Sequence, residues 1–469
     1  MNNKFSILFL SLALILSVFS FNGSVAFADQ TIKDAIPLSL NAMNQYSKRD
    51  ENNYYKVTLP SDGMLEVKVS NEYGYDQHFA VIDDNGGQYS DYIYTDDSQY
   101  ASGYSSQKIG LAAGTYYIKH VSNDYYEGFS YKLGAYFTPS DLWEKEWNGV
   151  VTQATDLKLN KVYSAAVNSH YDDDFYSFTL VKDGFTDIKV SNAPYVYQKY
   201  ELFTIKNGKK IDMFYNTTDD SEYSSGYTVL TTGLPKGKYY VRVTQPNDEY
   251  DSSINKTYKI IVNATYTDFW EKEDNNTVPT STTLSLDHYY HGYICYGDYD
   301  FYKLTLSKGT HLQLNALNDQ EDYMNYQITD SRGNERFYLS TNSGQYASGH
   351  KTGRFYLPAG TYYLRIDSDG KIIYDFAFKQ VTPTLGGSNV TVTNYKSKSD
   401  TIYVKGIKKD DVVKVYNSKN KLIATKKSTG TSTTATVKQL GKTAGYVYVT
   451  LTRASMLESG KLKESYKKE

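Results

Sequence analysis

Two short segments of the chain carry carboxylate and amide side chains at alternate positions. In extended backbone, residues i and i+2 point to the same side, so each segment can aim three oxygens at one point. Calcium takes about six to eight oxygen ligands from carboxylates, carbonyls and waters. The spacing therefore predicts a calcium site at each segment; the alternative is that these are solvated linker charges. The six residues are Glu144, Glu146, Asn148, Glu271, Glu273 and Asn275.

Motifs for covalent or zinc-dependent catalysis are missing from the sequence. The seven histidines form no H-E-x-x-H, and neither G-x-S-x-G nor a phosphate-binding G-x-x-x-x-G-K-[ST] occurs. His288 and His291 lack a supporting ligand pattern, and the single Cys295 is better read as a core or surface thiol than as a nucleophile. Paired acidic residues leave a glycosidase open on residue types alone. We nevertheless predict a protein without catalytic activity, because the repeats described next leave no stretch for a catalytic domain.

Internal repeats organise the chain that positions these residues. QYASG (99–103), EYSSG (222–226) and QYASG (345–349) lie 123 residues apart, and the same period links AAGTYYI (112–118), PKGKYYV (235–241) and PAGTYYL (358–364). This period is too long for a solenoid repeat, so each unit should be a domain with its own core.

Within each unit the hydrophobic pattern has a period of two. Leu65, Val67 and Val69 alternate with Glu66 and Lys68, and turns rich in Gly, Asn and Asp separate such runs. This pattern is typical of antiparallel strands with one solvent-exposed face. No long run repeats its apolar residues with the 3.6-residue period of a helix. We expect an all-β fold: three tandem antiparallel jelly-roll-like β-sandwiches followed by a C-terminal Ig-like β-sandwich.

The boundaries follow from composition and from matching linkers at 138–148 and 265–275, which place Trp143 and Trp270 alike. Residues 1–28 read as a signal peptide, with the uncleaved anchor as the alternative, so we expect a secreted protein without a membrane span after cleavage. A single cysteine rules out a disulfide framework. The predicted domains are repeat 1 (29–137), repeat 2 with its linker (138–264), repeat 3 with its linker (265–381) and a basic Ig-like domain (382–469).

The E-x-E-x-N linkers, the D-x-D-F-Y strand starts (172–176 and 298–302) and the late LPAGTYY strand (357–363) resemble the bacterial pre-peptidase C-terminal domain, a family that includes the collagen-binding modules of clostridial collagenases. The resemblance covers about residues 30–380 as three copies. It implies jelly-roll modules that accompany secreted enzymes and assist attachment, sometimes with calcium at the linker, but it does not imply catalysis. In the family a catalytic domain usually precedes these modules, and none is present here.

By this resemblance, acidic residues at a strand start join the linker in holding calcium. They are Asp172, Asp174, Asp298 and Asp300. The first repeat has no E-x-E segment and its strand start reads RDEN (49–52), so we predict no ion there. Two stretches of the tail, 400–417 and 439–450, resemble Ig-like modules of bacillus surface proteins.

The late strand of each repeat offers a candidate binding surface. Its second tyrosine should face outward beside a cation, because alternate residues share a face. Such a row could form a recognition stripe for a protein fibre or a glycan; the alternative is ordinary cross-strand packing. The residues are Tyr117, Lys119, Tyr240, Arg242, Tyr363 and Arg365.

Charge is unevenly distributed along the chain. Residues 382–469 hold 17 Lys and Arg against 6 Asp and Glu, a balance of +11, while the rest of the chain carries −14. We therefore expect a secreted binding or adhesion protein whose modules contact an extracellular protein or polysaccharide polymer, with the basic domain on an anionic cell wall and no nucleic-acid partner. The alternatives are a self-associating matrix or coat protein and an extracellular hydrolase.

Overall fold

The computed structural model describes residues 31–47, 52–122, 129–169, 172–245, 256–295, 297–317, 323–341 and 349–469. The predicted signal peptide (1–28) and residues 49–51 of the first strand start lie outside these ranges. The chain divides into two compact units, Met1–Ser140 and Asp141–Glu469, which are described separately.

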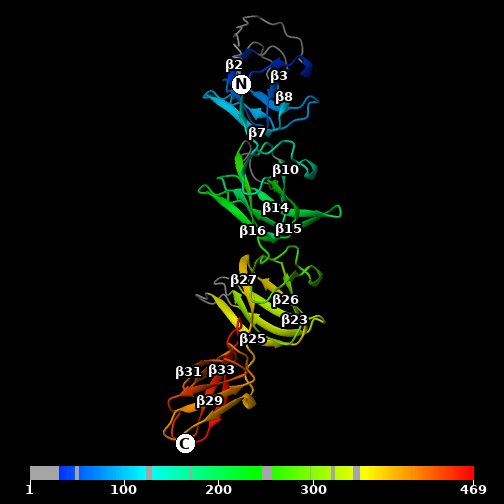
Figure 1. Cartoon of the computed structure of the whole chain (residues 1–469). Coiled ribbons are helices and arrows are strands. Elements are labelled where there is room, and N and C mark those ends of the chain that lie inside the picture. Colours follow the sequence, from blue (N-terminus) through cyan, green and yellow to red (C-terminus); the bar gives the residue numbers. More distant parts are fainter. Residues whose placement is uncertain are drawn as a thin grey trace, which may run out of the picture. The chain divides into compact units, whose positions relative to one another are not determined.

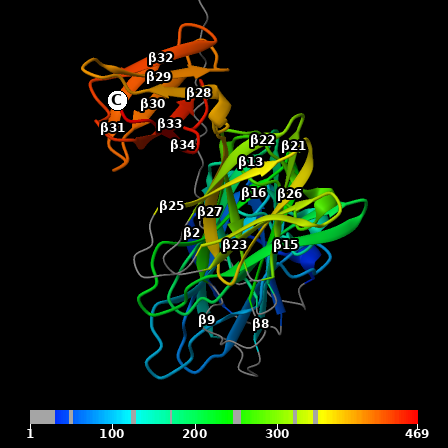
Figure 2. The same ribbon diagram turned by 90° about the horizontal axis from the view of Figure 1, so that it is seen from below.

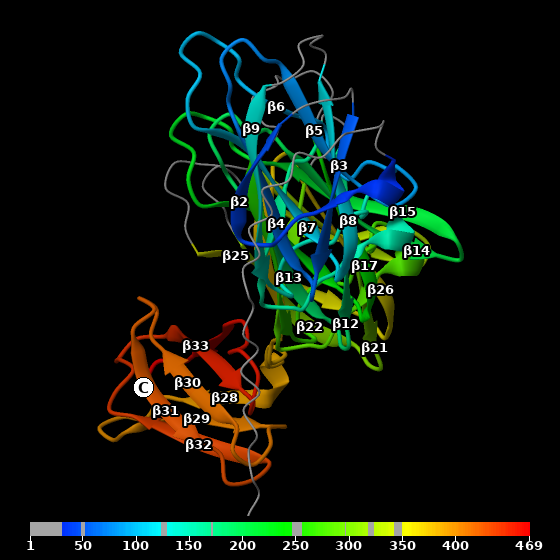
Figure 3. The same ribbon diagram turned by 90° about the horizontal axis from the view of Figure 1, so that it is seen from above.

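The first unit contains two sheets, with strand orders β1-β3-β8-β5-β6 and β2-β9-β4-β7. In Figure 3, β3, β8 and β5 lie side by side, as their antiparallel pairing requires. A 3₁₀ turn, η1 (Ile32–Asp34), precedes β1, which pairs parallel with β3. The strands are β1 (Ile36–Pro37), β2 (Ala42–Ser47), β3 (Asn52–Leu59), β4 (Gly63–Ser70), β5 (Gln77–Ile82), β6 (Ile93–Tyr94), β7 (Tyr104–Leu111), β8 (Gly114–Ser122) and β9 (Ser130–Pro139).

The second unit opens with the same arrangement. Its first two sheets have the orders β10-β12-β17-β14-β15 and β11-β18-β13-β16, preceded by η2 (Val151–Gln153). The strands, coloured cyan to green in Figure 1, are β10 (Thr155–Asp156), β11 (Val162–Ala166), β12 (Asp173–Leu180), β13 (Gly184–Ser191), β14 (Lys199–Lys206), β15 (Lys209–Thr217), β16 (Tyr227–Leu234), β17 (Gly237–Thr244) and β18 (Thr257–Tyr266).

The arrangement recurs once more along the chain. Sheets β19-β21-β26-β23-β24 and β20-β27-β22-β25 follow η4 (Val278–Thr280). The strands are β19 (Thr282–Thr283), β20 (Tyr289–Ile294), β21 (Asp300–Leu306), β22 (Thr310–Leu317), β23 (Met324–Asp330), β24 (Glu335–Ser340), β25 (His350–Leu357), β26 (Gly360–Ser368) and β27 (Ile372–Gln380).

The C-terminal residues form two smaller sheets with a different order, β28-β29-β32 and β31-β30-β33-β34, after η5 (Gly387–Asn389). Figure 2 shows these strands gathered in one orange and red body. They are β28 (Val390–Thr393), β29 (Asp400–Lys405), β30 (Val412–Tyr416), β31 (Leu422–Lys427), β32 (Ser432–Val437), β33 (Gly445–Thr452) and β34 (Leu462–Tyr466).

Alternating burial explains why these segments form two-layered sheets. β4 and β13 bury every second side chain, so one face of each strand is apolar and the other is wet. The buried side chains form four separate apolar clusters, three in the repeats and one among β28–β34. The predicted all-β fold with tandem antiparallel sandwiches is confirmed. Within the described residues, no helix has the length and apolar character needed to cross a bilayer.

A matched pair of substitutions in the third repeat tests this core. Leu314 on β22 is fully buried, whereas Ile373 on β27 is 52% exposed. Leu314→Ala should lower the free energy of unfolding of that repeat by about 2–5 kcal/mol, because it removes buried methyl groups and leaves a cavity. Ile373→Ala should change it by less than about 0.5 kcal/mol. Calorimetry of the full chain measures both, and equal effects would contradict this packing.

Candidate functional site

Each acidic linker is held in place by backbone pairing with β11 or β20, the second strand of its own sandwich. Glu144 N donates to Ser164 O at 2.9 Å, and Ser164 N donates to Leu142 O at 2.9 Å. In the third repeat, Glu271 N donates to His291 O at the same distance. The linkers are therefore extended at these points, and the alternate side chains turn toward the sandwich.

The second repeat brings three predicted carboxylates together. Glu144, Glu146 and Asp174 each offer an oxygen, and these atoms lie within 4.8 Å of one another. Asn148 is fully buried beside the cluster, and both its side-chain polar atoms lack a hydrogen-bond partner among the described residues. Asp172 is half-buried, and its Oδ2 accepts a hydrogen bond from Asn168 N at 2.6 Å.

The third repeat builds the same cluster from Glu271, Glu273 and Asp300, whose oxygens also lie within 4.8 Å. Asn275 and Asp298 are buried with them. Five buried polar atoms here have no hydrogen-bond partner among the described residues. They are Glu273 Oε1, Asn275 Oδ1 and Nδ2, Asp298 Oδ2 and Asp300 Oδ1.

Two buried tyrosines connect the carboxylates of the second repeat. The Tyr176 hydroxyl lies 2.9 Å from Glu144 Oε2 and 2.7 Å from the Tyr258 hydroxyl, which lies 2.5 Å from Asp174 Oδ2. These three contacts need three protons, but two phenols supply only two. One carboxyl must therefore be protonated, or a cation must replace the missing proton.

The same deficit recurs in the third repeat. The Tyr374 hydroxyl contacts the Tyr302 hydroxyl at 2.6 Å, Asp300 Oδ2 at 2.6 Å and Glu271 Oε2 at 3.3 Å. Here too, three contacts share two phenolic protons. Gly292 allows this approach, because a Cβ there would collide with the Tyr374 hydroxyl.

The first repeat keeps the tyrosine pair but not the carboxylates. Tyr55 and Tyr131 are hydrogen-bonded through their hydroxyls, and the Tyr131 hydroxyl lies 3.1 Å from His120 Nδ1. Strand register places Asn53, paired with His120, at the position of Asp174 and Asp300. A neutral imidazole can accept the second phenolic proton at Nδ1, so these two contacts need only the two protons that the phenols supply.

Burial raises the pKa values of the clustered carboxyls. The pKa of Glu146 rises to about 7 and that of Asp298 to about 6, chiefly because burial removes the charged form from water. The pKa values of Glu144, Asp174, Glu271, Glu273 and Asp300 rise well above the ordinary range, because burial acts together with repulsion between neighbouring carboxylates.

This donor set suits a hard divalent cation. Carboxylate and amide oxygens are preferred ligands of calcium, whereas zinc favours sulfur and imidazole, and neither cluster contains a cysteine or histidine. A cation would neutralise the grouped carboxylates and give the orphaned oxygens a partner. The residues present in the second and third repeats therefore fit calcium, and the described residues of the first repeat do not.

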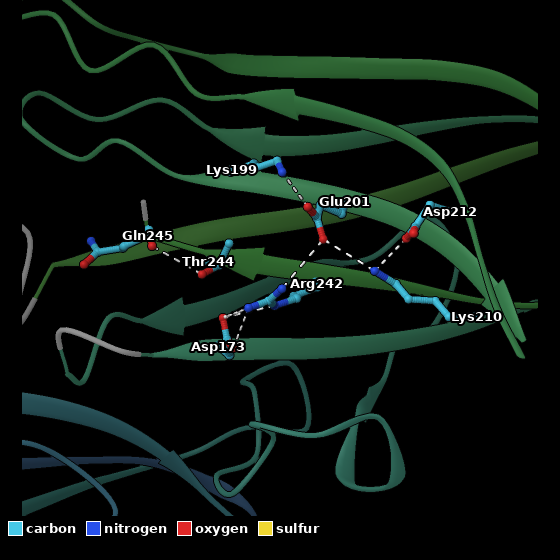
Figure 4. Close-up of polar contacts among 8 residues, drawn as sticks. All are labelled: Asp173, Lys199, Glu201, Lys210, Asp212, Arg242, Thr244 and Gln245. Carbon is cyan, nitrogen blue, oxygen red and sulfur yellow. Dashed lines mark hydrogen bonds and ion pairs between the residues drawn. The ribbon is translucent and has the colours of Figure 1, made fainter. Parts of the chain in front are cut away.

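The predicted recognition stripe lies on the outer sheet face, where its members are half-buried. On β17, the Arg242 guanidinium is bidentate to Asp173, at 2.7 Å and 3.1 Å, and lies 3.8 Å from Glu201 (Figure 4). Tyr240 stacks on Phe203 with ring centroids 5.4 Å apart. The Arg242 guanidinium and the Tyr240 ring therefore already contact side chains of the adjacent strands β12 and β14.

The other two stripes lie on the equivalent strands. Arg365 pairs with Asp367 at 2.8 Å, and Tyr363 is half-buried beside it. Tyr117 and Lys119 are half-buried on β8. The inside–outside assignment holds, since the preceding tyrosine of each strand is buried, but recognition by these residues stays a prediction.

Sequence reasoning missed the most exposed tyrosines. Tyr100 and Tyr223 are 83% and 85% exposed, and each lies in one of the five-residue landmarks used above to find the repeat. A signal was present: the landmark keeps its tyrosine in every copy although the residues around it change. Tyr346 of the third copy lies outside the described residues.

Comparisons with known proteins return structural likenesses only. No family model and no curated protein matches the chain. A pre-peptidase C-terminal domain of collagenase from Bacillus anthracis is 22% identical, with 21% of this chain and 92% of that chain covered and a TM-score of 0.18. The adhesin domain of Epf from Streptococcus pyogenes is 13% identical, with coverages of 36% and 70% and a TM-score of 0.16.

A glycoside hydrolase domain, Endo-D from Streptococcus pneumoniae, is 12% identical, with 38% of this chain covered and a TM-score of 0.19. The present chain spans only 33% of that protein. These likenesses carry no argument about activity.

The proton deficit predicts an unusual pH dependence for the metal-free protein. A carboxyl with a raised pKa binds its proton more tightly in the folded chain than in the unfolded chain. For Glu146, the resulting stabilisation is fully present at pH values below its ordinary pKa of 4.5 and is lost as the pH rises through its folded-state pKa of about 7. With a chelator present, the thermal midpoints of the second and third repeats should decrease as the pH is raised from 5 to 8. Glu144→Gln with Asp174→Asn should flatten this dependence in the second repeat; an unchanged slope would contradict the assignment.

Proposed function

We propose that the chain is a secreted, non-catalytic binding protein that contacts an extracellular polymer through repeated β-sandwich modules and rests on an anionic polymer, such as a cell wall, through its basic C-terminal domain. The observation that carries the proposal is the unbalanced charge of that domain. All its lysines except Lys414 are exposed. Among the described residues, ion pairs join Lys414 to Glu458 at 2.7 Å and Lys427 to Asp410 at 2.8 Å, leaving the other fourteen of its sixteen lysines without a carboxylate partner.

An uncompensated cationic surface favours a polyanion for a physical reason. Binding releases the counterions that both partners hold, and the attraction weakens as salt rises. The domain also presents aromatic rings beside its lysines, with Lys463 above Tyr446 at 4.0 Å and Lys461 above Tyr416 at 4.6 Å. Such pairs hold the ammonium groups at defined positions on the outer face of a sheet.

Calcium has a structural role in this proposal. In the third repeat, Glu273 N donates to Gly233 O at 3.1 Å, and the Trp270 ring stacks on Phe185 at 4.7 Å between centroids. An ion at Glu271, Glu273 and Asp300 would hold the linker against its sandwich and fix this contact with β16 and β13. The ion would supply charge neutralisation, while the protein's own residues set the geometry.

Retention on a polyanion tests the binding function. Full-length protein should be retained on immobilised polyglutamate at about 20 mM salt and released by about 0.5 M salt, where the screening length is only a few ångströms. Lys426→Glu with Lys467→Glu should weaken retention about tenfold, because two repulsive charges replace two attractive ones. The control is Lys189→Glu with Lys259→Glu in the second repeat. Equal retention of the two variants would refute the assigned surface.

Calcium titration tests the metal sites independently. Isothermal calorimetry should give two ions per chain, with a rise in the thermal midpoints of the second and third repeats. Glu271→Ala with Glu273→Ala should leave one ion, and Asn53→Ala in the first repeat should leave two. If millimolar calcium produced no heat of binding and no thermal shift, the proposed metal sites would be refuted.

A further inference from the structure

The loop tips that carry Tyr100 and Tyr223 are built alike in the two repeats where they are described. In the first, the Asn71 side chain accepts from Asp96 N at 3.1 Å and donates to Ser102 O at 3.2 Å. In the second, the Asn192 side chain accepts from Asp219 N at 3.2 Å and donates to Ser225 O at 3.3 Å. One asparagine thus ties two loops together in each repeat.

A neighbouring backbone contact repeats as well. Gly74 N donates to Asp97 O at 3.0 Å, and Tyr195 N donates to Asp220 O at 2.8 Å. Both tips also close through the same turn, in which Asp96 and Asp219 accept from the amides two residues later. The tips are therefore defined loops, here called the tyrosine tips (96–103 and 219–226).

The tyrosine of each tip has no structural role that the described residues reveal. Its ring is more than four-fifths exposed, and it forms no hydrogen bond or ring contact with them. An exposed tyrosine offers a partner an apolar ring together with a polar hydroxyl. Its retention in all three landmarks, including Tyr346, points to a contact made with another molecule.

The charge around the tips selects the class of partner. Asp96 and Asp97 flank Tyr100, and Asp219, Asp220 and Glu222 flank Tyr223. Neither tip contains a lysine or arginine, and the amides of the turn hold the pKa values of Asp96 and Asp219 below their ordinary value. A polyanion would be repelled, whereas a lysine-rich surface would gain both ion pairs and cation–π contacts.

We propose that the tyrosine tips of one copy of this chain bind the lysine-rich C-terminal domain of a second copy. The charges are complementary: the two tips hold five carboxylates and no lysine or arginine, whereas residues 382–469 have a balance of +11. Because the two surfaces differ, the contact is heterologous, so copies add head to tail, into rings where the rotation closes and into open assemblies where it does not. The proposal goes beyond polymer binding, and the two uses of the lysines compete.

Sedimentation velocity on three forms of the full chain tests this. Wild-type protein should associate with rising concentration at about 20 mM salt and dissociate at about 0.5 M salt or with added polyglutamate. The triple Tyr100→Ala, Tyr223→Ala, Tyr346→Ala variant should associate about tenfold more weakly, and the corresponding triple Phe variant should keep its association because the ring remains. The control, Tyr215→Ala, removes a tyrosine that is 63% exposed on a strand rather than on a tip, and should behave as wild type.

Complementation separates a heterologous contact from a symmetric one. The triple alanine variant still offers a basic domain, and a Lys426→Glu, Lys467→Glu variant still offers its tips. Each should associate about tenfold more weakly than wild type when alone, whereas the mixture should form a discrete complex of the two variants that does not grow. A wild-type chain that stays monomeric at every concentration, association that survives the tyrosine changes, or a mixture that forms no complex would each overturn the proposal.

Polymer retention keeps the two proposals distinguishable. The triple alanine variant should bind polyglutamate as wild type does, because that binding needs only the lysines. Loss of retention on a neutral polysaccharide by this variant would assign the tips to a glycan and overturn the assembly proposal. Failure to bind polyglutamate would remove the proposed function and the competition by polyglutamate, while salt-sensitive association that needs the tyrosines would still support the assembly.

Discussion

Grouped carboxylates buried beside phenols, with too few protons to satisfy their contacts, are the constraint that governs the second and third repeats. Burying one charged carboxylate costs several kcal/mol, on the order of a third of the stability of a typical domain, and grouping three raises the cost through repulsion. Glu144, Glu146 and Asp174 cannot all remain charged without a cation. Either the cluster holds protons, as the raised pKa values of Glu144 and Asp174 allow, or it holds an ion.

The same sandwich works without this constraint in the first repeat. There the tyrosine pair is kept, while Asn53 and His120 stand where the other repeats have the carboxylate and its strand partner. The scaffold therefore does not require the carboxylates, and the proposed ion would give them a partner in the other two repeats. Calcium would then set the attachment of each acidic linker.

Alternation along the chain was enough to predict the sheets and the alignment of Glu271, Glu273 and Asn275, because period-two patterning acts locally. The tyrosine chain could not be predicted in this way: Tyr302 and Tyr374 lie on different sheets and meet only when the sandwich closes. The outward face of Tyr240 was also predictable, but its stacking on Phe203 was not, since cross-strand neighbours depend on register. The exposure of Tyr100 required coordinates, because a loop gives no periodic signal.

The most direct measurement of the central claim is the number of ions that each folded chain retains. Native mass spectrometry of protein equilibrated with calcium at neutral pH should show two ions per chain, falling to one when Glu144 and Asp174 are replaced by Gln and Asn. A chain that retains no calcium at neutral pH, with its second and third repeats still folded, would contradict the account.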